Sequence, residues 1–392
     1  MLTRTATLAV AAIVLLPHPF SRAYVITGDD STAVPSEHVT SEGRKFTLLL
    51  PPRIEAHAVG SVPLLFAVHC FGCVAADMLS FAGPAQRYGF ALALPEESRR
   101  GAGFAALECC GESQRGGVDD LGNLRRIADQ VAALHPAVSL SAVFGTGWSN
   151  GGFLVAADAL AAAREGTPRL FAAIAPIAGF QYDAVVDAGG VGKRGRAAAA
   201  LPLPVLLFHS EDDPLVKFGG CCNGHGGGGG GGNLRASRCC CRIGAARDAC
   251  VGTPQVLAGY GALNRCATQL TPPPSPPSPL LQASLGLFQA TTVAGPGGFR
   301  CMALAGCAAN ATLCAHPGGL GHFAPFKEGF PRAALDAVGD FFAREACVGI
   351  GAGSWDSARK ECTCPRRQRH TGAQSTAASG ALPGRYCLAR GS

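Results

Sequence analysis

The sequence contains no large concentration of charge of one sign. Its 33 basic and 27 acidic residues give a formal net charge of +6, and its basic cluster, Arg366, Arg367 and Arg369, lies near the C-terminus. A nucleic-acid-binding domain usually carries basic side chains clustered along one face. Because the charge is spread thinly over the chain, we expect no nucleic-acid partner.

Long apolar runs are also missing. The N-terminal run, residues 8–16, contains nine apolar residues, whereas a helix that spans a membrane needs about 20. Arg4 precedes this run, and Ser21 and Ala23 supply small residues at the two positions that signal peptidase requires. We therefore expect residues 1–23 to be a signal peptide, the mature protein to be extracellular, and no later segment to cross a membrane.

The cysteines lack the histidines that a zinc site would pair with them. The chain has 18 cysteines, and no histidine lies at ligand spacing from Cys239, Cys240 and Cys241 or from Cys362 and Cys364. So many cysteines are typical of exported proteins, in which thiols are oxidised to disulfides. The sequence therefore favours disulfides over zinc and agrees with secretion.

The chain of 392 residues is long enough for one large domain with additions. Two low-complexity segments interrupt its second half, a cysteine- and glycine-rich one over residues 221–250 and a proline-rich one over residues 272–279. Both are typical of surface insertions. We expect one domain over residues 24–346 that carries these insertions, followed by a cysteine-containing tail over residues 347–392.

Apolar runs alternate with helical patterns along this domain. Asp119 and Asp120 open the first predicted helix, where the helix dipole favours negative charge, and we interpret both as structural. Strands that alternate with helices predict a mostly parallel sheet flanked by helices, and therefore an α/β fold. The predicted helices are residues 118–134 and 153–164, and the predicted strands are residues 46–50, 63–68, 90–94, 142–145, 170–175 and 205–209.

A Gly-x-Ser-x-Gly motif lies between a predicted strand and a predicted helix. It consists of Gly147, Ser149 and Gly151. In so glycine-rich a chain, chance alone gives about 0.4 such matches, so the motif by itself is weak evidence. A sharp turn between a strand and a helix, however, is the position of a nucleophile elbow, where only small neighbours fit beside the serine. The context therefore predicts Ser149 as a nucleophile.

A serine nucleophile needs a histidine base and a carboxylate that orients the histidine. In this fold the order along the chain is serine, acid, histidine. Asp213 comes just after the strand at residues 205–209, and catalytic groups of open α/β sheets collect at such carboxyl ends. We predict Asp213 as the acid, with Glu211 and Asp212 as alternatives.

Among the histidines, His322 is the predicted base. It follows a short predicted strand near residues 311–315 and the glycine-rich residues 317–321, and it lies downstream of the predicted acid. His316 is the alternative. His69 and His209 lie at the ends of predicted strands, where we expect structural hydrogen bonds instead of proton transfer.

Acyl transfer also requires backbone N–H donors directed at the developing oxyanion. One candidate donor is the amide of Asn150, directly after the nucleophile. The other lies at Cys70 or Phe71, in the turn that ends the strand at residues 63–68. This chemistry implies neither a metal ion nor an organic cofactor.

Taken in order, these motifs resemble the secreted feruloyl esterase and polyhydroxybutyrate depolymerase-like family of α/β-hydrolases. The resemblance extends from about Phe46 to Phe342, without the insertion at residues 221–250. It implies the α/β-hydrolase fold, and it places the family's triad on Ser149, Asp213 and His322. The motifs that carry it are residues 63–72, 109–111, 118–122, 147–151, 175–179, 213–216 and 321–322.

The chain departs from this family at two places. The oxyanion turn has His69 followed by Cys70, where the family usually has His-Gly, so the position of the donor amide differs. The three residues after His322 are Phe-Ala-Pro instead of the family's common Thr-Trp-Pro, which removes an aromatic side chain from the acyl pocket.

Cysteine pairs lie in the oxyanion turn and further along the chain. We expect Cys70 or Cys73 to bond to Cys109 or Cys110 and so to hold the turn beside the site, with several connectivities open.

The resemblance implies a secreted serine carboxylic-ester hydrolase that acts on feruloyl or acetyl esters of polysaccharide. A polyhydroxyalkanoate depolymerase is an alternative, although such enzymes often carry a separate binding domain, for which the tail after Cys347 is short. The altered oxyanion turn, the lost aromatic side chain and the low-complexity segments are the grounds for an alternative from another class, a catalytically degenerate secreted binding protein, but all three residue types of the triad are present in order. A peptidase is a third alternative, but no residue marks a pocket for a peptide.

Overall fold

The computed structural model describes residues 34–106, 111–165, 167–180, 201–219, 252–268, 289–322, 331–350 and 353–363. The expected signal peptide, both expected insertions, Cys109, Cys110 and the tail after residue 363 lie outside these residues. The predictions that concern these segments alone therefore stay predictions.

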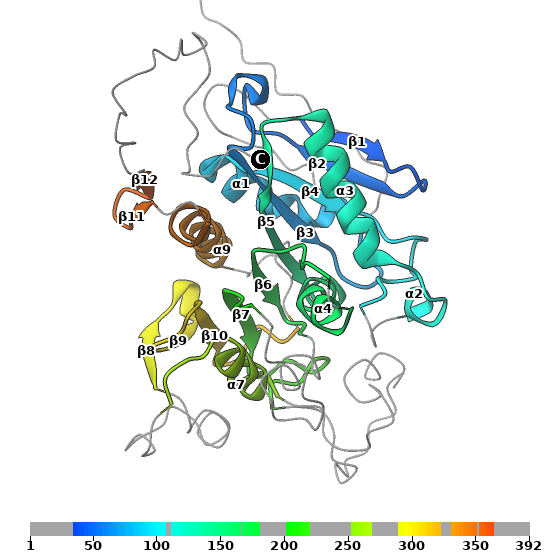
Figure 1. The fold of residues 1–392 in the computed structure, drawn as a ribbon. Helices are drawn as coiled ribbons and strands as arrows, with labels where there is room; N and C mark the ends of the chain where they lie inside the picture. The colour runs from blue at the N-terminus through cyan, green and yellow to red at the C-terminus, as the bar shows by residue number, and fades with distance from the viewer. Residues whose placement is uncertain are drawn as a thin grey trace, which may run out of the picture.

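A ten-stranded sheet forms the centre of the described part of the chain, in the order β1-β2-β4-β3-β5-β6-β7-β10-β9-β8 (Figure 1). The inner strands β4, β3, β5, β6, β7 and β10 are parallel to one another. The outer strands join antiparallel. The strands are β1 Ser36–Val39, β2 Lys45–Leu49, β3 Val62–Val68, β4 Ala91–Pro95, β5 Val138–Trp148, β6 Ala173–Ile177, β7 Val205–Ser210, β8 Ala290–Ala294, β9 Arg300–Leu304 and β10 Ala311–His316.

Helices cover both faces of the sheet (Figure 1). α3, α4 and α7 pack on one face, and α1 and α9 pack on the other. Short 3-10 or π turns extend over Ile54–Ala56, Ala75–Phe81, Pro296–Gly298 and Glu345–Ile350. The α-helices are α1 Ala82–Tyr88, α2 Gly111–Arg115, α3 Asp120–Leu134, α4 Asn150–Glu165, α7 Thr253–Leu263 and α9 Arg332–Arg344.

The central strands are apolar throughout because helices cover them on both sides. Every residue of β3 is buried. Leu64 and Phe66 pack toward α3 and α4, whereas Leu65 and Ala67 pack toward α1 and α9. A strand with two buried faces shows no apolar and polar alternation, which explains why these runs were recognisable in the sequence as short continuous apolar segments.

All of the predicted strands, including the short one near residues 311–315, and both predicted helices are present. The predicted run at residues 142–145 is the middle of the longer strand β5. The outer strands β1, β8 and β9 and the helices α1, α2, α7 and α9 were not predicted. β8 is exposed at every position, so its residues carry no burial pattern from which a strand is predicted.

Disulfides connect neighbouring elements, as the cysteine content predicted. Cys301 and Cys314 lie opposite each other on β9 and β10 and are bonded, and a second bond joins Cys266 to Cys307. The start of the expected tail is bonded through Cys347 and Cys362. There, a hairpin of β11 Ser354–Asp356 and β12 Glu361–Thr363 packs against the core on the face of the sheet that α1 and α9 cover.

The topology identifies the fold. A mostly parallel sheet with helices on both faces, in which the first strands lie beyond β4 at one edge and the elbow follows the central strand β5, is the α/β-hydrolase fold. The expected fold class is confirmed.

Candidate active site

Ser149 is the single residue between a strand and a helix. β5 ends at Trp148 and α4 begins at Asn150. Ser149 has a φ of 53°, in the left-handed region that non-glycine residues rarely adopt. Its amide donates to the carbonyl of Ile177 over 2.8 Å, and its carbonyl accepts from the amide of Phe153 over 3.0 Å. These bonds hold the strained turn of a nucleophile elbow.

The small residues around Ser149 are required by close backbone contacts. A Cβ atom on Gly147 would lie 2.5 Å from the carbonyl carbon of Gly151, and a Cβ atom on Gly151 would collide with the carbonyl oxygen of Val68. Gly179, just after β6, approaches the backbone of Ser149 in the same way. The elbow therefore fits between β3 and β6 only with glycine at these positions.

Asp213 lies in the turn after β7 and accepts four hydrogen bonds. Its Oδ1 accepts from the amides of Leu215 and Val216 over 2.8 and 2.9 Å. Its Oδ2 accepts from Nδ1 of His322 over 2.7 Å and from Nε2 of His209 over 3.1 Å. Burial alone raises the pKa of this carboxyl, but the bonds from His209 and His322 outweigh it and lower the pKa to about 2. Asp213 is therefore ionised at neutral pH.

His322 lies between Asp213 and the elbow. Its ring packs against Trp148, the residue before Ser149, with 5.3 Å between ring centroids. Because Nδ1 is bound to Asp213, Nε2 is the nitrogen that is left to exchange a proton. The structure thus brings the predicted acid, the predicted base and the turn of the predicted nucleophile to one end of the sheet.

The alternative acids are engaged elsewhere. Asp212 accepts from the amides of Gly319 and Gly321, over 2.6 and 3.0 Å, so it binds the loop that carries His322 and not the imidazole itself. Glu211 forms an ion pair with Arg300 over 3.2 Å. Among the three acids, Asp213 is the one that contacts His322.

The alternative histidines also have other partners. His316, at the end of β10, packs against the ring of Phe299 and accepts from the amide of Gly318 over 3.4 Å. His69 is fully buried, and its Nδ1 lies 2.8 Å from the carbonyl oxygen of Cys70. The expected structural hydrogen bond of His69 is present.

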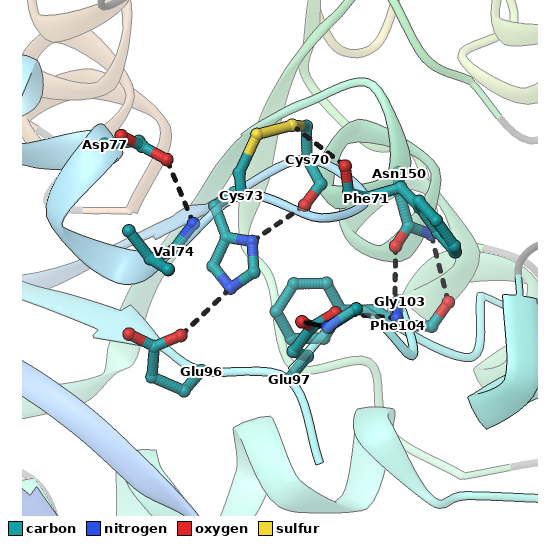
Figure 2. The surroundings of a disulfide bond; sticks show 12 residues. Cys70, Phe71, Cys73, Val74, Asp77, Glu96, Glu97, Gly103, Phe104 and Asn150 are labelled. Carbon is teal, nitrogen blue, oxygen red and sulfur yellow. Dashed lines mark hydrogen bonds and ion pairs between the residues drawn. A yellow bond between two sulfur atoms is a disulfide. The ribbon is translucent and has the colours of Figure 1, made fainter. Parts of the chain in front are cut away.

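The turn after β3, in which a donor to the oxyanion is predicted, is closed by a disulfide between Cys70 and Cys73 (Figure 2). The expectation that one of these cysteines bonds to Cys109 or Cys110 is wrong. The turn brings the two Cα atoms to 5.1 Å, within the range that a disulfide spans, and the amide of Cys73 donates to the carbonyl of Cys70 over 3.2 Å. A bond across four consecutive residues therefore forms locally.

Asn150 ties the elbow to a neighbouring loop. Its side-chain Oδ1 accepts from the amide of Phe104 over 2.6 Å, and its Nδ2 donates to the carbonyl of Phe104 over 3.0 Å (Figure 2). The Asn150 side chain is thereby fixed, and its amide lies at the first residue of α4, where helix N-H groups favour negative charge.

The second candidate donor region adjoins the first. A Cβ atom on Gly151 would lie 2.6 Å from the carbonyl oxygen of His69, so the turn after β3 contacts the start of α4. Phe71, at the tip of this turn, is 49% exposed. Its ring covers Gly103, where an added Cβ atom would lie 2.6 Å from the ring. Asn150, Cys70 and Phe71 therefore line one side of the elbow.

Several residues that support the site were missed in the sequence. Glu97 accepts from the amide of Gly103 over 2.6 Å, and Thr253 lies 2.5 Å from Nδ1 of His209. Neither belongs to a recognisable motif, and Thr253 lies 44 residues from His209 in the chain. Contacts between such distant positions leave no local pattern.

Among the residues that the structure describes, no group of three or more His, Cys, Asp or Glu side chains is arranged to hold a metal ion. Within the same residues, every helix is too short or too polar to cross a membrane.

No family model and no curated protein sequence matches the chain. Among solved structures, it is similar to an acetyl xylan esterase from Aspergillus awamori, with a TM-score of 0.44 and 11% identity over 79% of this chain and 98% of that one. It is also similar to a thermostable esterase, with a TM-score of 0.35 and 20% identity over 47% and 48% of the two chains. An S-formylglutathione hydrolase from Staphylococcus aureus gives a TM-score of 0.33 and 16% identity over 49% and 82%.

Proposed function

We propose that the protein is a secreted serine carboxylic-ester hydrolase. Ser149 is the nucleophile, His322 is the general base, and Asp213 orients His322. The observation that carries this proposal is the 2.7 Å hydrogen bond between His322 Nδ1 and Asp213 Oδ2. The His322 ring packs against Trp148, and the next residue, Ser149, is held at positive φ between a strand and a helix.

The proposed reaction proceeds in two steps. As Ser149 Oγ attacks the ester carbonyl carbon, Nε2 of His322 takes the hydroxyl proton and the carbonyl oxygen becomes an oxyanion. The tetrahedral intermediate then expels the alcohol, which receives that proton from His322, and an acyl-serine remains. Water attacks the acyl-serine in the same way, with His322 as base, and releases the carboxylic acid and free Ser149.

The oxyanion is assigned to backbone amides. The amide of Asn150, at the start of α4, is the first donor, and the amide of Cys70 or Phe71 is the second. The fixed side chain of Asn150 and the disulfide between Cys70 and Cys73 support this assignment because both limit movement of the donors before the charge develops.

Asp213 fits the role of the orienting acid. Its pKa of about 2 keeps it ionised, so it holds the proton of His322 on Nδ1 and leaves Nε2 as the base. The same charge stabilises the imidazolium that forms during the attack.

For the substrate, we favour feruloyl or acetyl esters linked to polysaccharide. The motifs of the sequence that resemble the feruloyl esterase and depolymerase-like family support this class. The half-exposed ring of Phe71 beside the proposed donors adds an aromatic surface that suits a planar acyl group. Polyhydroxyalkanoate is the alternative polymer, and the disulfides agree with an extracellular substrate.

The test uses the full chain, expressed through the secretory pathway of a eukaryotic host and purified from the medium. We expect hydrolysis of nitrophenyl acetate, methyl ferulate and acetylated xylan, and a loss of about 10⁶ in turnover for Ser149→Ala. Ser141→Ala, which changes an exposed serine on the same strand, is the matched control and keeps full activity.

Two results would contradict the proposal. Equal hydrolysis by the wild type and by Ser149→Ala would exclude Ser149 as the nucleophile. A folded wild type that hydrolyses none of the esters and does not react with a fluorophosphonate probe would favour the degenerate binding protein instead.

A further inference from the structure

A second histidine binds the carboxylate oxygen that His322 binds. His209, in β7, has its Nε2 3.1 Å from Asp213 Oδ2, and His322 has its Nδ1 2.7 Å from the same atom. His209 has no exposed surface. It does not belong to the proposed triad, yet it shares with His322 the same carboxylate oxygen of the proposed acid.

The hydrogen-bond partners define the tautomer of His209. An ionised carboxylate accepts hydrogen bonds and donates none, so Nε2 of His209 carries a hydrogen and donates it to Asp213. With the hydrogen on Nε2, Nδ1 is an acceptor. The hydroxyl of Thr253, 2.5 Å away, then donates to it. Thr253 therefore selects the tautomer of His209 that binds Asp213.

The ring of His209 is fixed by its surroundings. Phe180 packs edge-on against it at 5.1 Å between centroids, and Phe218 lies at 5.7 Å. Thr253 is the first residue of α7, and its amide donates to the carbonyl of Phe218 over 2.8 Å. A continuous set of contacts thus extends from the start of α7 through His209 to Asp213.

From this geometry we infer that His209 is a positioning residue for the proposed acid, with Thr253 as its partner; the inference rests on the proposed function. His209 fixes the plane of the Asp213 carboxylate, and it draws part of the negative charge of Oδ2 away from His322. The two neighbouring acids on this turn have other partners, since Asp212 binds the amides of Gly319 and Gly321 and Glu211 pairs with Arg300.

The first test compares two substitutions of His209 in the full chain. His209→Leu removes the donor, and we expect kcat to fall by about 10-fold to 100-fold with a much smaller change in KM. Without His209, Oδ2 binds His322 alone and stabilises its protonated form more strongly. The acid limb of the kcat/KM profile therefore moves about half a unit to one unit to higher pH. His209→Gln keeps an N-H donor, and it restores most of kcat and the position of the acid limb.

The second test uses Thr253. Thr253→Val removes the hydroxyl that selects the tautomer, and it shifts kcat and the acid limb in the same direction as His209→Leu, by a smaller amount. Thr253→Ser restores both values. Tyr260→Phe, which deletes another buried hydroxyl from α7, is the matched control and leaves the pH profile unchanged.

A third measurement does not depend on ester hydrolysis. The low-field proton resonance of His322 Nδ1–H is followed by NMR as a function of pH in the wild type, His209→Leu and His209→Gln. We expect the titration midpoint to move to higher pH in the leucine variant alone.

The inference is overturned if His209→Leu keeps the wild-type kcat, acid limb and NMR midpoint. It is also overturned if His209→Leu and His209→Gln lose activity and thermal stability equally, with an unmoved acid limb, because His209 then only supports the fold. Failure of the proposed function looks different, since Ser149→Ala then equals the wild type while the NMR titration still reports on the histidine pair.

Discussion

Asp212 and Asp213 are adjacent in sequence and hold the same histidine in two different ways. Asp213 binds the imidazole of His322, whereas Asp212 binds the backbone amides of Gly319 and Gly321 in the loop that carries it. One carboxylate therefore orients the ring, and the other fixes the loop from which the ring extends.

Asp212→Ala removes both bonds to this loop. We expect kcat to fall by up to about 10²-fold, because a small displacement of the base is enough to reduce turnover by that factor. Asp213→Asn, which disturbs the imidazole directly, is expected to cost about 10⁴-fold. Steady-state kinetics with nitrophenyl acetate measures both. Equal losses for the two variants would contradict the division of roles.

The ionised state of Asp213 makes the stability of the fold depend on pH. Its pKa in the folded protein, about 2, lies below the ordinary value of 3.8. A carboxyl with a lowered folded pKa stabilises the protein above the unfolded pKa, and this contribution is lost as the pH falls from about 4 to about 2. The difference corresponds to about 2 kcal/mol of unfolding free energy.

Urea unfolding of the wild type and Asp213→Asn between pH 6 and pH 2.5 checks this expectation. The wild type should lose more stability than the variant over the acid part of the range, so the difference between their free energies of unfolding becomes smaller. A difference that stays constant with pH would show that Asp213 is not the group responsible.

Removal of the disulfide between Cys70 and Cys73 should affect activity more than stability. Stabilisation by a disulfide grows with the length of the loop that it closes, and these cysteines are separated by 3 positions, compared with 41 for Cys266 and Cys307. In Cys70→Ser/Cys73→Ser we expect a small fall in Tm. We expect a loss of about 10-fold or more in kcat, because the proposed donor amides are less fixed.

Cys266→Ser/Cys307→Ser is the matched control, with the opposite pattern of a larger fall in Tm and a smaller change in kcat. Differential scanning calorimetry and initial rates give the two quantities. If the Cys70→Ser/Cys73→Ser variant loses activity only because part of it is unfolded at the assay temperature, the turn has no special role in the reaction.

Phe71→Ala tests the aromatic surface beside the elbow. Its half-exposed ring is available for contact with an aromatic acyl group, and an aromatic pair contributes about 0.5–1.5 kcal/mol beyond buried area. We therefore expect kcat/KM for methyl ferulate to fall by about 3-fold to 10-fold. The value for nitrophenyl acetate should change little, since acetyl is too small to reach the ring. Equal losses for both esters would place Phe71 in the support of the turn and not in recognition.

Much of this molecule follows from local sequence. The strands β3 to β7 are predictable because helices bury both of their faces, and burial requires continuous apolar runs such as Val62–Val68. The glycines around Ser149 are recognisable because close backbone contacts leave no room for a Cβ atom at their positions. The order of Ser149, Asp213 and His322 also identifies candidates, although three neighbouring acids fit that order equally well.

The choice among those acids, the pairing of the cysteines and the bond between His209 and Asp213 were decided by the tertiary structure. The first and the last depend on which surfaces meet when distant segments pack, since the loop before His322 meets Asp212 and the start of α7 meets β7 at Thr253. Cys70 and Cys73 bond locally, but the path of the turn that brings them together is set by the fold. Periodicity and composition indicate whether a residue is buried, but they do not indicate which residue it contacts. That partner is determined only when the sheet and its helices pack together.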